Sequence, residues 1–350
     1  VGLPNVGKST LFNALTASKN AQAANFPFCT IDPNIGIVDV PDERLDQLSK
    51  LSNSKKKIFT NITFVDIAGL VKGASKGEGL GNKFLSHIRE VDAIIHLVRC
   101  FDSSEITHVN SEINPLNDLE TIKTEILLSD IDIIQKKLEK SKKKLLSSVE
   151  IQVLEKKLES LNKSEENMNS FDEEETKILN QLGLLSIKPK IIVCNVDEES
   201  LSSGNKYTAA VINKFLNEKV VIICADIEDQ IMGLDSEERE TFMRDIGLNK
   251  TGLNKLIREG YDLLNLDTYF TSGPEESRAW TVKKNTPAPQ AAAVIHTDFE
   301  KNFIRAEAVS CEDFIQYGSS EKCKENGKLR IEGKDYIVKD GDVLFFRVNP

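Results

Sequence analysis

The sequence predicts an α/β protein with a doubly wound parallel sheet, an inserted α-helical coiled coil and a small C-terminal β domain. Three observations support this. A glycine-rich motif opens the chain, several short apolar runs have the length of buried strands, and a long stretch with helical spacing lacks glycine and proline between Pro115 and Gly183. The predicted strands cover residues 60–67, 92–99, 190–195 and 219–226.

Residues 2–9 read G-L-P-N-V-G-K-S and match the phosphate-binding pattern G-x-x-x-x-G-K-[ST]. In such a P-loop the glycines let backbone N–H groups face a phosphate chain, Lys8 reaches the β/γ oxygens and Ser9 ligates Mg²⁺. The alternative is a glycine loop that only turns the chain, but the apolar spacing of residues 10–15 predicts a helix that opens at the motif. Only Val1 precedes Gly2, so the chain is expected to start inside the leading strand.

Two further segments have the features of nucleotide switches. Residues 25–34 carry prolines near both ends and one hydroxyl, Thr30, which is a candidate second ligand for Mg²⁺. The alternative is a plain connection with a surface threonine, and the segment by itself does not separate the two.

The run 60–67 has the character of a strand buried in a parallel sheet and reaches its end near Asp66. An aspartate there would hold the water shell of Mg²⁺, and the Gly69 amide could bond the γ-phosphate and sense its loss. Leu70 follows, where Ras-type GTPases have the glutamine that orients the attacking water. Because leucine cannot position water, hydrolysis needs another polar group, a partner or electrostatics alone.

His108 is the candidate water-positioning residue. It follows the apolar run 92–99 on a loop expected at the nucleotide edge of the sheet. The competing interpretation is a surface histidine without a chemical role. His96 lies inside the apolar run itself and is expected to be a core residue.

Residues 115–185 change in character, with leucines and isoleucines at heptad and three-four spacing between Lys and Glu faces. We expect an antiparallel coiled coil inserted into the sheet domain. Six lysines between 136 and 144 would gather near its turn, either as a basic tip for RNA or an acidic partner or as a solvated helix face.

The run 190–195 ends in the sequence N-V-D-E, residues 195–198, where GTPases have N-K-x-D. Glu198 stands in place of the aspartate that pairs with guanine, and Val196 replaces the lysine that packs over the base. The guanine-specific pair is therefore absent, and base selection should favour adenine or be relaxed.

Composition limits the possible partners. The chain has 350 residues and a net charge of −10, which opposes sequence-independent coating of nucleic acid, and no DNA sequence specificity is expected. No apolar run has membrane-spanning length. The six cysteines show no C-x-x-C spacing, which favours a reducing, cytoplasmic location.

Together, the stretches 2–9, 25–34, 66–81, 98–108 and 195–198 resemble Obg-like ATPases of the YchF type, P-loop proteins of the translation-factor class. The resemblance extends over nearly the whole chain, although the region around 147–149 is shorter than the family pattern. It implies four segments: a P-loop NTPase domain at 1–115 and 187–266, a helical insertion at 116–186, and a β-grasp TGS domain at 267–350.

The resemblance also implies a function: slow hydrolysis of ATP, with Mg²⁺, by a switch that binds the ribosome, expected through its large subunit, or another RNA–protein partner. The alternatives are a GTPase and a nucleotide-gated binding module with negligible hydrolysis. The catalytic set would be Lys8, Gly69 and His108, and the metal set Ser9, Thr30 and Asp66. The expected nucleotide contacts are Asn5, Val6, Gly7, Lys8, Ser9, Thr10, Asn195, Val196 and Glu198.

Overall fold

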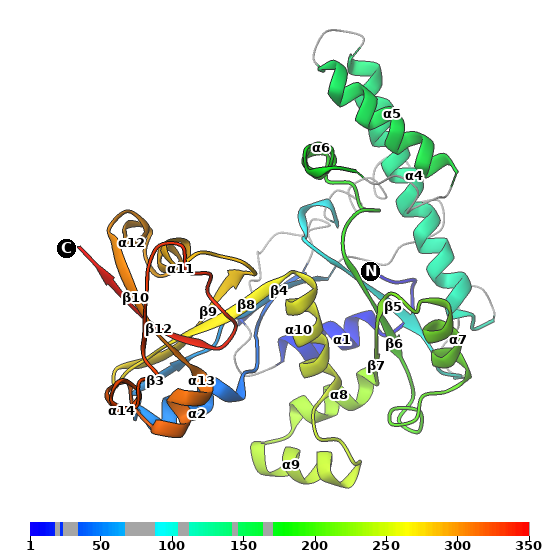
Figure 1. Ribbon diagram of the computed structural model, residues 1–350. Helices are drawn as coiled ribbons and strands as arrows, with labels where there is room; N and C mark the ends of the chain where they lie inside the picture. Colours follow the sequence, from blue (N-terminus) through cyan, green and yellow to red (C-terminus); the bar gives the residue numbers. More distant parts are fainter. Residues whose placement is uncertain are drawn as a thin grey trace. The chain divides into compact units, whose positions relative to one another are not determined.

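The structure is a computed structural model that describes residues 1–17, 22–23, 34–66, 88–103, 112–141, 146–163 and 171–349. The chain forms two compact units, of which the first contains residues 1–36 and 64–253 and the second contains residues 37–63 and 254–350. Most elements of both units are labelled in Figure 1. Among the described residues, no helix combines the length and the apolar character needed to cross a membrane.

The first unit is built on the parallel strands β5 (Ile94–Arg99), β6 (Lys190–Asn195) and β7 (Lys219–Ile223). The neighbouring residues pair in order from Ile94↔Lys190 to Arg99↔Asn195. Val1 lies along β5, because its amino group donates to the Ile95 carbonyl and its own carbonyl accepts from Leu97 N–H. Three of the predicted strands are thereby confirmed, and β6 is buried over almost its whole length, as expected for a covered parallel sheet.

Helices cover this sheet. The first unit contains α1 (Lys8–Thr16), α7 (Lys206–Lys214), α8 (Ala225–Gly233) and α9 (Ser236–Asp245), with α1 packed against α8. Val98, Cys194, Val211 and Ile227 belong to one buried apolar cluster that joins the strands to the helices. This cluster lies directly behind the loops that leave the carboxyl ends of β5 and β6.

The strand ending at Asp66 differs from its prediction. β4 (Asn61–Asp66) lies in a separate three-stranded sheet with β2 (Asn34–Asp39) and the two-residue β1 (Gln22–Ala23), in the order β1-β2-β4. Phe64 is the buried residue of β4, while Asn61 and Thr63 are exposed. The prediction of a strand buried on both faces is therefore wrong here, because polar residues at alternate positions leave one face in solvent.

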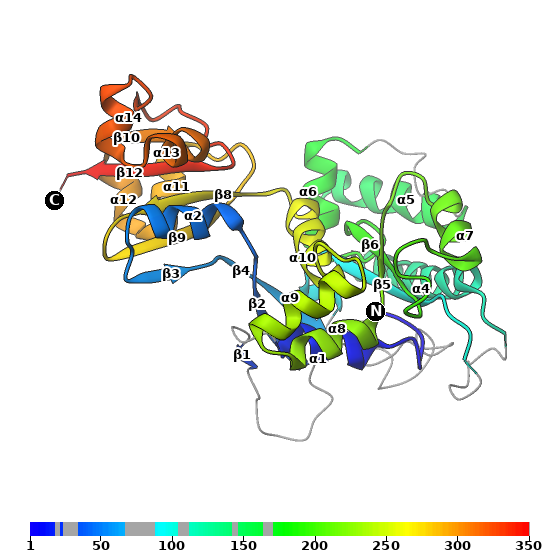
Figure 2. The ribbon, with the colours of Figure 1, turned by 90° about the horizontal axis from the view of Figure 1, so that it is seen from below.

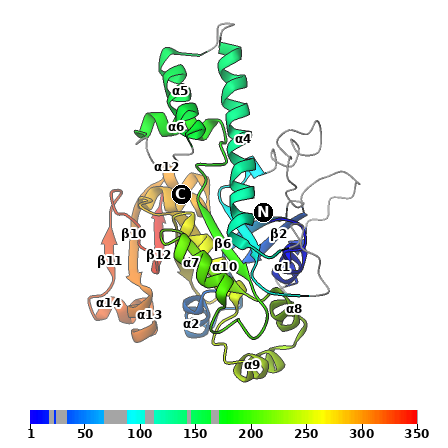
Figure 3. The same ribbon diagram turned by 90° about the vertical axis from the view of Figure 1, so that its right-hand side faces the viewer.

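The helical insertion contains α4 (Pro115–Ser141), α5 (Ser148–Asn162) and α6 (Glu173–Gln181). α5 runs back along α4, as seen in Figure 3, and Ile134, Val153, Leu154 and Leu179 are among the buried residues that join the three helices. Ser147 starts α5 with a capping box to Glu150, in which the serine side chain accepts from the Glu150 N–H and the glutamate accepts from the serine N–H. The predicted coiled coil is thus a helical hairpin with a third helix packed on it.

The second unit is a six-stranded sheet in the order β11-β10-β12-β8-β9-β3. β8 and β9 are antiparallel, β12 is parallel to β8 at its centre, and β10 is antiparallel to β12, which is the predicted β-grasp arrangement extended by one strand. Its elements are α2 (Glu43–Leu51), β3 (Lys56–Ile58), α10 (Gly252–Leu263, which starts in the first unit), β8 (Leu266–Ser272), β9 (Glu276–Lys283), α11 (Ala288–Ile295), α12 (Thr297–Lys301), β10 (Phe303–Ser310), α13 (Cys311–Tyr317), α14 (Ser320–Glu325), β11 (Arg330–Glu332) and β12 (Asp342–Val348).

Both faces of this sheet are covered. Adjacent residues of β8 point to opposite sides, so Tyr269 packs with the alanines of α11 and Phe270 packs with α2 and α13. Figure 2 shows α2 lying along β9, and the register places β3 beside β9 in parallel.

The second unit therefore takes residues 37–63 from the middle of the segment expected for the P-loop domain. Leu45 and Leu48 are fully buried against the C-terminal sheet, and Ser52 and Ser54 bond to Ser272 and Ser277. The four segment boundaries expected from the sequence remain predictions.

Candidate functional site

The loop at residues 2–9 has a backbone that few residues other than glycine could adopt. Gly7 has φ of 91° and caps α1 without a side chain, and Asn5 also has a positive φ, 63°. A Cβ built on Gly7 would lie 2.3 Å from the amide nitrogen of Asn195, and one on Gly2 would lie 2.7 Å from the Leu97 carbonyl oxygen. Both glycines of the motif are thus required by close approach to neighbouring strands as well as by the curl of the loop.

Asn195 holds this loop in place from the end of β6. Its side-chain amide donates to the Val6 carbonyl at 3.0 Å, and its side-chain oxygen accepts from Ala225 N–H, at the start of α8, at 2.9 Å. The Asn195 side chain is buried, and the main-chain carbonyl of Asn195 accepts from Cys100 N–H after β5. Asn195 therefore ties the P-loop to the end of β6, to the start of α8 and to the segment after β5. The sequence motif did not reveal this role.

Lys8 and Asp66 face one another at the mouth of the loop. The Lys8 ammonium lies 4.0 Å from Asp66 Oδ1, and both side chains are largely buried. Burial lowers the pKa of Lys8, and the negative charge of Asp66 opposes that shift. The lysine begins α1, so its charge adds to the positive end of the helix at the place where phosphate oxygens would lie.

Asp66 Oδ1 is buried and has no hydrogen-bond partner among the described residues. A buried carboxylate oxygen without a donor is costly unless a ligand or bound water meets it. Ser9, one residue after Lys8, is exposed at the same helix end. A carboxylate oxygen and a hydroxyl near a phosphate site are donors of the kind that Mg²⁺ prefers, so the described part of the predicted metal set fits that ion.

The remaining predicted residues divide into two groups. Val6 is buried, Asn5 is exposed and Thr10 is partly exposed on the first turn of α1. Thr30, Gly69 and His108 lie outside the residues that the structure describes, as do Leu70 and the basic residues 142–144.

In the predicted base-contacting stretch, residues 195–198, some side chains are buried and others are exposed. Asn195 is fully engaged inside the protein, and the Val196 side chain is buried in the apolar cluster behind β6. Glu198 is exposed. Of the three expected contacts in this stretch, Glu198 is thus the one whose side chain is open to a ligand, and contact between the base and any of these residues stays a prediction.

Arg99 is a residue of the site region that the sequence reasoning missed. Its guanidinium is fully buried, donates to the carbonyls of Phe101 and Ser103, and lies 4.6 Å from the centre of the Phe101 ring. These bonds fix the first turn of the segment that continues to His108. An arginine at the last position of an apolar strand was the signal available, since a buried charged residue must find partners.

Two family profiles match the chain. Residues 1–136 match a family described as a 50S ribosome-binding GTPase, and residues 266–349 match the C-terminal family of YchF GTPases, described as a protein of unknown function.

Relatives match along the whole chain. It is 50% identical to the "Ribosome-binding ATPase YchF" of Bacillus subtilis, with 100% of this chain and 98% of that protein aligned. Identity to the protein of the same name from Mycoplasma genitalium is 45%, again over 100% and 98% of the two chains. The solved structure titled "Structure of the Schizosaccharomyces pombe YchF GTPase" superposes with a TM-score of 0.85 at 38% identity, covering 99% of this chain and 96% of that one.

Proposed function

The chain belongs to the YchF family, and from this we propose that it is a ribosome-binding nucleotide switch that hydrolyses ATP slowly. The observation that carries the proposal is the P-loop, in which the glycine geometry and the Asn195 brace fix the backbone and Lys8 brings a positive charge to the start of α1. A helix N-terminus that follows such a loop binds the β and γ phosphates of a nucleoside triphosphate.

Mg²⁺ is proposed as the cofactor, held by Ser9 and Thr30 and, through its water shell, by Asp66. The support is the unpartnered Oδ1 of Asp66 beside Lys8. When bound, the ion would neutralise charge on the β and γ phosphates. Lys8 would balance the same charge from the protein side.

For hydrolysis we propose that the Gly69 amide senses the γ-phosphate and His108 orients the attacking water. Leu70 cannot do so, because its side chain neither donates nor accepts a hydrogen bond. Arg99 supports this assignment indirectly, since it anchors the carbonyls of residues 101 and 103 that lead into the His108 segment. Without a glutamine, the expected hydrolysis is slow.

ATP is proposed to be preferred over GTP. The relatives are named ATPases and the solved yeast relative is titled a GTPase, so the names do not agree on the base. The preference rests on side-chain chemistry: Glu198 is longer than the aspartate that pairs with guanine, and Val196 is buried where a GTPase has a lysine.

Calorimetric titration of the full chain with non-hydrolysable ATP and GTP analogues tests this choice. The ATP analogue should bind at least as tightly, and a tenfold preference for GTP, about 1.4 kcal/mol, would overturn the proposal. The Glu198→Asp variant should shift the preference toward GTP, whereas Glu199→Asp is the matched control at the neighbouring exposed position.

The proposed partner is the ribosome, through its large subunit, or another RNA–protein complex, and the proposed location is the cytoplasm. Support comes from the names of the relatives and from the match to a 50S ribosome-binding GTPase family. A nucleotide-gated binding module with negligible hydrolysis is the second candidate, favoured by the absent glutamine. Phosphate release measured with and without ribosomes separates them, since the module would release none in either case.

A further inference from the structure

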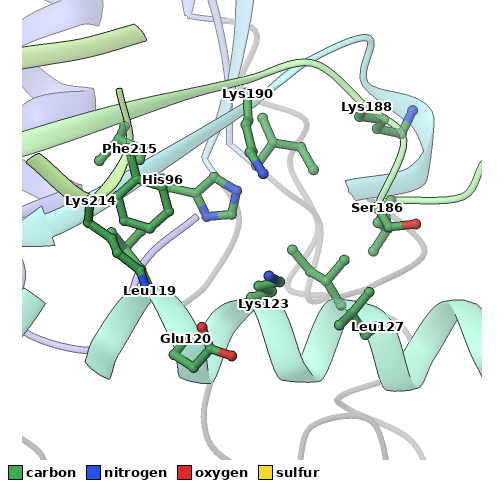
Figure 4. A pocket seen from close by; sticks show the side chains of 14 residues that line it. His96, Leu119, Glu120, Lys123, Leu127, Ser186, Lys188, Lys190, Lys214 and Phe215 are labelled. Carbon is green, nitrogen blue, oxygen red and sulfur yellow. The ribbon is translucent and has the colours of Figure 1, made fainter. Parts of the chain in front are cut away.

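A cavity of about 170 Å³ lies in the first unit, away from the P-loop. It is lined by α4, by the first residues of β5 and β6, and by the end of α7 (Figure 4). Lys190 begins β6 and Asn195 ends it, so the cavity and the P-loop brace are separated by the length of that strand, about 16 Å at 3.3 Å per residue. The space therefore does not belong to the nucleotide site.

Part of its lining is apolar, and its size suits one ring. Leu119 and Ile126 of α4, Ile94 of β5 and Phe215 after α7 are among the side chains that line it. An apolar cavity of about 150 Å³ holds a benzene molecule, so this one has room for a single aromatic ring or a branched alkyl group with a small substituent.

One wall of the cavity contains a histidine nitrogen that has no hydrogen-bond partner among the described residues. His96 lies in the cavity wall with 7% of its surface exposed, and its Nδ1 has no hydrogen-bond partner in the part of the chain that the structure describes. Burial lowers the pKa of His96 to about 3, so the imidazole is neutral at physiological pH. A neutral imidazole has one N–H donor and one acceptor, and leaving such a buried group unpaired costs about 1–3 kcal/mol.

Lysines surround the same space. Lys123, Lys188, Lys190 and Lys214 line the cavity together with one acid, Glu120. Lys190 also pairs with Glu218 at 3.2 Å. Burial lowers the pKa of Lys188, and the nearby carboxylates of Asp92 and Asp130 oppose that shift. Figure 4 shows the Lys190 and Lys123 side chains extending toward the space beside the His96 ring, from β6 and from α4.

We propose that this cavity binds a small organic anion with a single apolar ring or branched chain, of the aromatic carboxylate class. The ring would occupy the apolar space between α4 and Phe215. The carboxylate would lie near the ammonium groups of Lys123 and Lys190 and accept a hydrogen bond from His96. This inference needs no nucleotide and does not depend on the proposed function.

The test uses fluorine NMR of the full chain with 4-fluorobenzoate as the probe and 4-fluorobenzamide as its neutral counterpart. The carboxylate signal should shift or broaden in a saturable way, with an affinity at least about tenfold above that of the amide, because only the carboxylate meets the lysines. Binding should persist with a saturating ATP analogue and Mg²⁺, which separates this cavity from the P-loop.

Three variants locate the binding. Lys123→Met should weaken 4-fluorobenzoate about tenfold and leave the amide unchanged, whereas Lys137→Met, an exposed lysine on the same helix, should change neither. His96→Phe keeps a ring in the wall and removes its nitrogens, so it should weaken the carboxylate more than the amide. If it does not fold, the ¹⁵N shifts of the His96 ring in the unaltered chain serve instead, since they should move on titration.

Equal binding of the two probes, loss of carboxylate binding when the ATP analogue is added, or an unchanged affinity in Lys123→Met would each overturn the proposal. A cavity that holds only water would give no saturable signal, with the same consequence.

Discussion

Single atoms decide the shape of the P-loop. In the Gly7→Ala variant the new methyl group would stand 2.3 Å from Asn195 Nδ2, at a residue whose φ is 91°. The loop must then move or the Asn195 brace must break, at a cost of at least about 1 kcal/mol. ATP-analogue affinity, measured by titration, should fall more than about tenfold.

Gly233→Ala is the control for this experiment, because it ends α8 in the same unit and a Cβ there has no neighbour within 4 Å. If Gly7→Ala bound nucleotide as tightly as the unaltered chain, the loop would not be held by the contact described above.

His108 is predicted to contribute to the rate of hydrolysis and not to ATP binding. If it orients water, His108→Ala should reduce turnover by roughly ten- to ten-thousandfold and leave ATP affinity nearly unchanged, since such a contact acts mainly in the transition state. Lys8→Ala should damage binding as well, because Lys8 lies at the mouth of the loop. Phosphate release at saturating ATP is the measurement, with His296→Ala, an exposed histidine of the second unit, as the control. Unaltered turnover would leave a partner as the better source of catalysis.

The identity of the phosphate-binding residues followed from sequence, but their connections did not. The motif at residues 2–9 predicts where a phosphate binds, because few other arrangements need two glycines, a lysine and a serine at those intervals. The Asn195 brace could not be read from it, since it joins residues 189 positions apart. Val196 was expected near the base, yet its position in a strand-end sequence could not show that the side chain points into the core.

At the scale of elements, Asp130 fixes the return of the helical insertion to the sheet. This carboxylate of α4 is fully buried and accepts from Leu185 N–H, Ser186 N–H and the Arg89 guanidinium. Asp130→Ala should therefore lower the unfolding free energy by about 3 kcal/mol or more, because it leaves a partly buried arginine and two N–H groups without their acceptor.

Asp132→Ala is the matched comparison on the same helix. Asp132 makes an exposed pair with Lys136 at i,i+4, so its loss should cost less than about 0.5 kcal/mol. Denaturant melts of the two variants provide the test, and similar midpoints would contradict the anchoring role.

The start of α2 is predicted to be sensitive to acid. Asp42 caps this helix, and it pairs with Arg44 and with Arg258 of α10. Burial alone would raise the pKa of Asp42, but hydrogen bonds and charges from the two arginines lower it. Because the folded pKa lies below the unfolded value near 3.9, this contribution is complete above about pH 4 and is lost as the pH falls through the folded pKa.

Unfolding midpoints measured from pH 6 to pH 2.5 should show this loss, with a slope of up to about 1.4 kcal/mol per pH unit from this residue. In Asp42→Asn the slope should be smaller, whereas Asp46→Asn, an exposed change in the same helix, is the comparison. Equal slopes in Asp42→Asn and the unaltered chain would show that the cluster does not titrate in this range.

Across the molecule, local sequence patterns predicted the helices and strands better than they predicted which elements pack against one another. The sequences of β5, β6 and β7 are mostly apolar, so the sequence predicted that these strands would be buried. The amphipathic pattern of α2 shows that Leu45 and Leu48 face a core, but not which one, and in the structure they pack on the C-terminal sheet. Long-range choices of this kind depend on shape complementarity between faces that are far apart in the sequence.

This division of the chain changes how ribosome binding should be tested. Deleting residues 267–350 would uncover Leu45 and Leu48, which are fully buried, and would remove the partner strand of β3. A truncated chain would thus expose apolar surface and could pellet with ribosomes through nonspecific binding. The assay therefore needs the full chain.

Ribosome pelleting of the full chain should depend on which nucleotide is bound. With a net charge of −10, the chain lacks the excess of basic residues that would hold it on RNA in every state, so binding must rely on surfaces that the γ-phosphate controls. The fractions pelleted with an ATP analogue and with ADP should therefore differ, and Lys8→Ala should remove the difference because it weakens both nucleotides at the P-loop. Equal pelleting in the two states, at physiological salt and saturating nucleotide, would contradict the switch and leave constitutive binding as the account.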